Sequence, residues 1–153
     1  DLTNAVVVAA DVGSVKRAGF FARRLDLPMA IIDKRRISDT NVVQGSIVGE
    51  VDGCNAFIFE DEIATGTTLL TTMQTLHDAG VRKIFVGATH PVFCGQAIAN
   101  FAAAPVEAIF VTNTVDVPPE KQLDKITVLS VAPLLAAAIE RIHTGESVGA
   151  LFS

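Results

Sequence analysis

The chain has 153 residues, which suits one folded domain, and with 50% hydrophobic and 19% charged residues it can bury a substantial core. Its net charge of −5 argues against a nucleic-acid-binding surface, because duplex binding needs clustered cations. The sequence has no apolar run of the roughly 18 residues that a membrane-spanning helix needs, and no signal-peptide pattern at its start. We therefore expect no nucleic-acid partner and no membrane partner.

In chain order, short apolar runs alternate with helical periods. We predict a strand over 5–10, a helix over 14–25, a strand over 29–32, a mobile polar loop over 34–44, strands over 46–51 and 57–59, a helix over 67–79, a strand over 83–88, a helix over 96–103, strands over 108–111 and 126–129, and a helix over 134–144. In the first helix, Ser14 is the expected N-cap, and Phe20, Phe21 and Leu25 form the expected apolar face.

This alternation predicts an α/β fold, with a mainly parallel sheet flanked by helices on both faces in a Rossmann-like three-layer arrangement. We expect a single domain over residues 1–153. Ligands of such sheets bind beyond the carboxyl ends of the strands. Four of the segments that follow predicted strands are polar: 11–14, 33–36, 60–68 and 89–95.

The strongest functional pattern follows the strand predicted at 57–59. Glu60 and Asp61 can accept hydrogen bonds from vicinal hydroxyls, such as those of ribose. Backbone N–H groups at the start of the next helix can wrap a phosphate, and Gly66 permits close approach of the backbone. The residues of this expected phosphate loop are Ala64, Thr65, Gly66, Thr67 and Thr68. The alternative is a solvated turn in which Thr67 is an ordinary N-cap.

Two further segments carry residues that suit phosphate chemistry. Lys34 and Arg36 stand one residue apart after a strand, where they could close over a transferring phosphoryl group. Arg35 could serve instead of Arg36, and a solvated basic loop is the alternative. Asp11, before Gly13, could bind Mg²⁺ or could simply cap a helix.

Residues 57–69 resemble the phosphoribosyl pyrophosphate (PRPP) binding signature of the type I phosphoribosyltransferase fold. That fold is shared by phosphoribosyltransferases and by ribose-phosphate pyrophosphokinases, also called PRPP synthetases. Residues 11–18 resemble the Asp-x-Gly-Gly segment of the pyrophosphokinases, 30–36 resemble their catalytic flexible loop, and 89–97 resemble their Thr-His segment. The resemblance covers nearly the whole chain and implies the C-terminal half of such an enzyme, with the N-terminal half absent.

The resemblance implies a ribose-phosphate diphosphokinase domain, which makes PRPP and AMP from ATP and ribose 5-phosphate with Mg²⁺. It implies Lys34 and Arg36 as catalytic residues, and Glu60, Asp61 and the loop 64–68 as the ribose 5-phosphate site. It also implies a pyrophosphate loop at Asp11, Gly13 and Ser14, with Asp11 as a metal ligand, and a phosphate or regulatory site at His90. It further implies a homo-oligomer built from dimers, as a hexamer or a tetramer, and little activity of the fragment alone.

Two departures from the family pattern keep alternatives open. Many members carry an Asp where this chain has Ala64, and the pyrophosphokinases usually have Asp-Asp where this chain has Glu60 and Asp61. One alternative is a phosphoribosyltransferase that consumes PRPP, and another is a non-catalytic regulatory protein associated with PRPP synthetase. Cys54 and Cys94 do not make a disulfide framework, and we interpret both as reduced core residues of a cytoplasmic protein, with a disulfide or reactive thiol as the alternative. Because the chain begins without Met, we expect it to be a piece of a longer protein.

Overall fold

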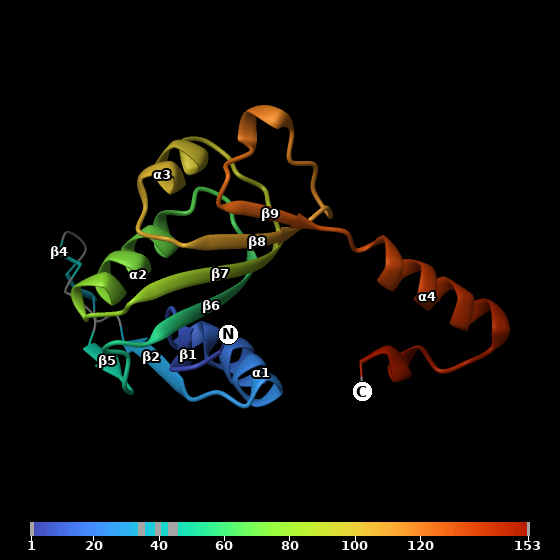
Figure 1. Cartoon of the computed structure of the whole chain (residues 1–153), viewed down its shortest axis with the longest axis horizontal. Helices are drawn as coiled ribbons and strands as arrows, with labels where there is room; N and C mark the ends of the chain where they lie inside the picture. The colour runs from blue at the N-terminus through green and yellow to red at the C-terminus, as the bar shows by residue number, and fades with distance from the viewer. Residues whose placement is uncertain (1, 34–35, 39–40, 43–45, 153) are drawn as a thin grey trace.

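The sheet is seven-stranded, in the order β5-β2-β1-β6-β7-β8-β9 (Figure 1). This computed structural model describes residues 2–33, 36–38, 41–42 and 46–152, with the backbone alone at 36–38 and 41–42. The sheet strands are β1 (Ala5–Ala9), β2 (Met29–Asp33), β5 (Ser46–Val48), β6 (Asn55–Glu62), β7 (Lys83–His90), β8 (Ala108–Thr112) and β9 (Ile126–Leu129). Every neighbouring pair is parallel except β2 and β5, which confirms the mainly parallel α/β fold.

Helices cover both faces of this sheet, as predicted. The α-helices are α1 (Val15–Leu25), α2 (Thr67–Asp78), α3 (Ala97–Ala103) and α4 (Ala132–Thr144), and the 3₁₀ turns are η1 (Val12–Ser14), η2 (Pro119–Lys121) and η3 (Val148–Leu151). On one face, α1 packs Ala18 and Ala22 against the β1 side chains. On the other face, α2 and α3 build the larger core, in which Met73 and Phe101 are fully buried.

The last helix behaves differently from the other three. Figure 1 shows α4 leading away from the sheet, beyond the end of β9. None of its residues is buried, and it exposes Leu134, Leu135, Ile139 and Ile142. In the described part of the chain, no helix is long and apolar enough to cross a bilayer.

Several sequence predictions need correction. The polar segment 34–44 contains a two-stranded ribbon of β3 (Arg36–Ser38) and β4 (Asn41–Val42), and its predicted mobility concerns residues that lie largely outside the described ones. Phe20 does not belong to the apolar face of α1, because it is 53% exposed. Ser14 is the N-cap residue of α1, as predicted, but its side chain makes no capping hydrogen bond there. Cys94 is exposed rather than in the core, and both described thiols are free.

Candidate functional site

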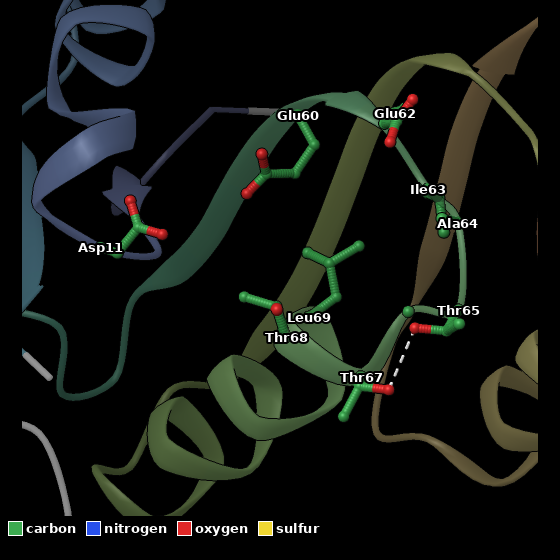
Figure 2. A pocket seen from close by; sticks show the side chains of 10 residues that line it. Asp11, Glu60, Glu62, Ile63, Ala64, Thr65, Thr67, Thr68 and Leu69 are labelled. Carbon is green, nitrogen blue, oxygen red and sulfur yellow. Dashed lines mark hydrogen bonds between the residues drawn. The ribbon is translucent and has the colours of Figure 1, made fainter. Parts of the chain in front are cut away.

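A cavity of about 230 Å³ lies at the carboxyl end of the sheet, between the loop after β1 and the loop after β6. Its lining residues are Asp11, Glu60, Glu62, Ile63, Ala64, Thr65, Gly66, Thr67, Thr68 and Leu69. Figure 2 shows the Asp11 and Glu60 carboxylates on one side of this space and the Thr67 end of α2 on the other. The structure therefore brings together two of the predicted acids, Asp11 and Glu60, and the whole predicted phosphate loop.

The two-residue period of β6 decides which of its acids reach the cavity. Ala56 and Ile58 point into the larger core, and Glu60 and Glu62 continue on the same side of the strand and line the cavity. Asp61 points to the opposite side and does not line the cavity, and its side chain is 78% exposed. Glu62 is a lining residue that the sequence analysis missed, although the strand period could have identified it.

The predicted phosphate loop is flanked by two buried side chains, Ile63 and Leu69. Ile63 is 1% exposed and Leu69 is 3% exposed. The loop residues between these two are at least partly exposed. Gly66 adopts φ +75°, and a Cβ atom there would overlap the ring of Phe101. Gly66 itself is the N-cap of α2, so Thr67 is the first helical residue rather than an ordinary cap.

Backbone hydrogen bonds also fix this loop to the segment after β7. The N–H of Ile63 donates to the carbonyl of His90 at 2.9 Å, and the N–H of Phe93 donates to the carbonyl of Ile63 at 2.9 Å. The N–H of Cys94 donates to the carbonyl of Ala64 at 3.1 Å. The loop thus enters α2 in a defined conformation, with N–H groups at the positive end of a helix of 12 residues.

Asp11 combines a structural contact with a position at the cavity. Its Oδ1 accepts a hydrogen bond from the N–H of Ser14 at 2.8 Å, and Ser14 Oγ accepts one from the N–H of Asp11 at 3.2 Å. This reciprocal cap holds η1 and confirms the capping role that was left open. Of the predicted pyrophosphate loop, only Asp11 lines the cavity; Ser14 is buried and Gly13 is exposed.

Arg17 is the main residue that the sequence analysis did not place in the site. Its Nη2 forms an ion pair with Glu60 Oε2, and its Nη1 forms one with Asp61 Oδ2. Its Nε donates to the carbonyl of Phe59 at 2.7 Å. Nothing in the local sequence could reveal these contacts, because they join α1 to the end of β6 across more than 40 residues.

The remaining predicted residues lie away from the cavity or outside the described part of the chain. His90 ends β7 and is not among the residues that line the cavity. Its Nδ1 lies 2.9 Å from Thr114 Oγ1. Lys34 lies outside the described residues, and Arg36 opens β3 with its backbone alone described. Among the described residues, no group of three or more His, Cys, Asp or Glu side chains is placed to hold a metal ion.

The chain is similar to known proteins along most of its length. A family model described as "Phosphoribosyl synthetase-associated domain" matches residues 43–153. A ribose-phosphate pyrophosphokinase of Deinococcus radiodurans is 47% identical over 100% of this chain and 49% of its own length. The crystal structure of phosphoribosylpyrophosphate synthetase from Mycobacterium smegmatis has a TM-score of 0.85 at 32% identity, covering 93% of this chain and 46% of that chain.

A likeness to a phosphoribosyltransferase concerns the fold alone. The crystal structure of orotate phosphoribosyltransferase from Aeropyrum pernix has a TM-score of 0.56 at 16% identity, covering 87% of this chain and 66% of that chain. At this identity the shared arrangement of strands and helices is all that the likeness establishes. It confirms the phosphoribosyltransferase-like architecture predicted from the sequence.

The chain spans about half the length of the curated relatives that it matches. The predicted assignment of the chain to the C-terminal half of such an enzyme is not supported by these matches.

Proposed function

Since this chain belongs to the phosphoribosyl synthetase-associated domain family, we propose that it is the ribose 5-phosphate-binding domain of a ribose-phosphate diphosphokinase. The complete enzyme transfers the diphosphoryl group of ATP to the 1-hydroxyl of ribose 5-phosphate and releases AMP. One observation carries the proposal: a single cavity joins the Glu60 carboxylate to the loop 64–68 at the positive end of α2. A sugar phosphate needs both of these features together.

In this proposal the two ends of ribose 5-phosphate meet different parts of the cavity. The 5-phosphate takes N–H groups of the loop 64–68 and the hydroxyls of its threonines, aided by the helix dipole. Glu60 in the cavity, and Asp61 outside its lining but paired with the same Arg17, accept hydrogen bonds from ribose hydroxyls. A carboxylate oxygen is a strong acceptor for such bonds.

The carboxylates around the cavity also suit Mg²⁺. This ion prefers oxygen ligands and takes one or two carboxylates together with water and substrate phosphates. Asp11 meets that requirement, since it lines the cavity opposite the phosphate loop and its orientation is fixed by the Ser14 cap. When bound, Mg²⁺ would neutralise charge on the polyphosphate of ATP.

Transfer itself relies on positioning and charge rather than on a covalent intermediate. Lys34 and Arg36 are the proposed catalytic residues, which stabilise the charge on the transferring diphosphoryl group. Gly13 and Ser14 shape the loop beside the pyrophosphate, and His90 stays a candidate for a phosphate or regulatory contact. The half of the relatives' length that this chain does not span contributes to the ATP site, so the chain alone has little or no activity.

The wider setting of the enzyme is part of the same proposal. Residues 1–153 act as one domain of a cytoplasmic homo-oligomer built from dimers. Ala64 supports one second candidate, a non-catalytic protein associated with PRPP synthetase, because many family members carry an Asp at this position. A full-length protein that binds ribose 5-phosphate but makes no PRPP would favour that candidate.

Calorimetric titration with ribose 5-phosphate tests the binding site. Changing Glu60→Gln removes a charged acceptor, and a hydrogen bond to a charged group contributes about 1.5–3 kcal/mol, so we expect an affinity loss of about tenfold or more. Glu107→Gln is the control, because Glu107 pairs with Lys83 on the exposed surface instead of lining the cavity. Equal affinities of the two variants would contradict the proposed sugar site.

A Lys34→Ala change in the full-length protein tests the transfer step. Removing one preorganised donor to a developing charge typically lowers kcat by about 10²–10³. We expect PRPP formation to fall by that order while ribose 5-phosphate binding persists. Lys121→Ala, in η2, is the charge-matched control, and an unchanged rate in Lys34→Ala would remove Lys34 from the mechanism.

A further inference from the structure

We propose that Arg17 is the positioning residue that turns Glu60 and Asp61 into one acceptor site for a ribose diol. The inference rests on the proposed ribose 5-phosphate site and adds to it a residue from α1. Arg17 contacts both carboxylates and the carbonyl of the preceding residue, Phe59, so three of its nitrogen atoms are bound at the end of β6.

The strand itself cannot make this acceptor site. Neighbouring residues on a strand point to opposite faces, so Glu60 and Asp61 leave β6 in opposite directions. Two acceptors for adjacent hydroxyls must lie on the same side of the sugar. The guanidinium is flat and presents its donors in a fixed fork. By holding one oxygen of each carboxylate, Arg17 draws both carboxylates to a common edge.

Arg17 contacts only one oxygen of each carboxylate. Each carboxylate has two oxygens and about four lone-pair positions. Arg17 pairs with Oε2 of Glu60 and Oδ2 of Asp61, so the second oxygen of each group is not taken by Arg17. The side chain of Arg17 is only 23% exposed, which suits a residue that orients the two carboxylates without contacting the sugar itself.

Charge gives Arg17 a second effect at the same place. Asp11, Glu60 and Glu62 line a cavity that is proposed to hold a phosphate, and no Lys or Arg is among its lining residues in the described chain. The negative charges of these carboxylates repel a phosphate that is bound in the same cavity. The positive charge of Arg17 beside Glu60 offsets part of that repulsion.

The test compares three ligands on the full-length protein: ribose 5-phosphate, 2-deoxyribose 5-phosphate and inorganic phosphate. The wild-type protein is expected to bind ribose 5-phosphate at least tenfold more tightly than the deoxy sugar. In Arg17→Gln, we expect that ratio to fall to within about threefold, while the affinity for inorganic phosphate changes less than the affinity for ribose 5-phosphate. Arg17→Lys keeps the positive charge but lacks the planar guanidinium. It should restore the affinity for inorganic phosphate without restoring the preference for ribose 5-phosphate over the deoxy sugar.

The control is Arg24→Gln, an exposed arginine on the same helix. If Arg17→Gln lowered the affinities for ribose 5-phosphate and 2-deoxyribose 5-phosphate by the same factor, the positioning role would be overturned and only a charge effect would remain. Tighter ribose 5-phosphate binding in Arg17→Gln would overturn it too, since Arg17 would then be blocking the site. A wild-type protein without preference for ribose 5-phosphate would instead contradict the proposed function. Retained phosphate binding and an unchanged melting temperature distinguish all of these results from misfolding.

Discussion

At the scale of single residues, Gly66 meets two requirements that no other residue type meets together. Its φ of +75° lies in the left-handed region, and a Cβ atom would overlap the Phe101 ring. We expect Gly66→Ala to lower the free energy of unfolding by about 2–3 kcal/mol, combining backbone strain with overpacking. Phosphate affinity should fall with it, because Gly66 is the N-cap from which α2 begins.

Gly53 provides the matched control. Its φ is +69°, and an added Cβ would meet nothing within 4 Å. Gly53→Ala therefore carries the backbone strain alone, about 1–2 kcal/mol. Chemical denaturation of both variants separates the two terms, and equal losses would contradict the proposed clash with Phe101.

The same scale explains which site residues could be predicted. Glu60 and the loop 64–68 form a local pattern, so their meeting follows from the order of a strand, a turn and a helix. The pairing of Arg17 with Glu60 links residues 43 positions apart. Only the folded sheet, which lays α1 beside the end of β6, brings them into contact.

At the scale of elements, α3 depends on a lysine from outside the helix. Lys125 precedes β9, and its Nζ donates to the carbonyls of Phe101, Ala102 and Ala104 at 3.2, 3.3 and 3.2 Å. A cation at a helix C-terminus interacts favourably with the last carbonyls and with the negative end of the helix dipole. We expect Lys125→Met, which keeps the aliphatic stem, to cost about 1–2 kcal/mol, and thermal unfolding should show a decrease of about 3–6 °C.

Lys83→Met controls for the loss of a positive charge. Lys83 pairs with Glu107 at the surface, with 40% and 48% of the two side chains exposed, and such pairs contribute about 0–1 kcal/mol. A melting temperature of Lys125→Met equal to that of Lys83→Met would show that the three carbonyls gain nothing from the lysine.

Elements also show why sequence patterns underestimate strand length. The apolar run predicted a strand only over 57–59, whereas β6 continues to Glu62. Its polar end remains in the sheet because β7 pairs with it, Glu60 beside Ala88 and Glu62 beside His90. A neighbour's backbone extends a strand where side-chain hydrophobicity has ended, and this places the acids in the strand rather than in a loop.

At the scale of the whole molecule, the sheet and its first three helices form one packed body, and α4 stands apart from it (Figure 1). None of the residues of α4 is buried, and Ile139 and Ile142 are 67% and 69% exposed. Removing residues 132–152 therefore exposes little core. We expect the shortened chain to keep a cooperative unfolding transition within about 3 °C of the parent, since surface changes alter stability by about 0.5 kcal/mol or less.

Two measurements test whether α4 is independent of that body. Fluorescence of a dye that binds exposed apolar surface should fall on truncation, because the apolar face of α4 is then gone. Phe101→Ala provides the scale for a real loss of core, since Phe101 is fully buried and such a change costs about 3–5 kcal/mol. A truncation that destabilises the chain as much as Phe101→Ala would mean that α4 supports the packed body, even though every one of its side chains is at least partly exposed.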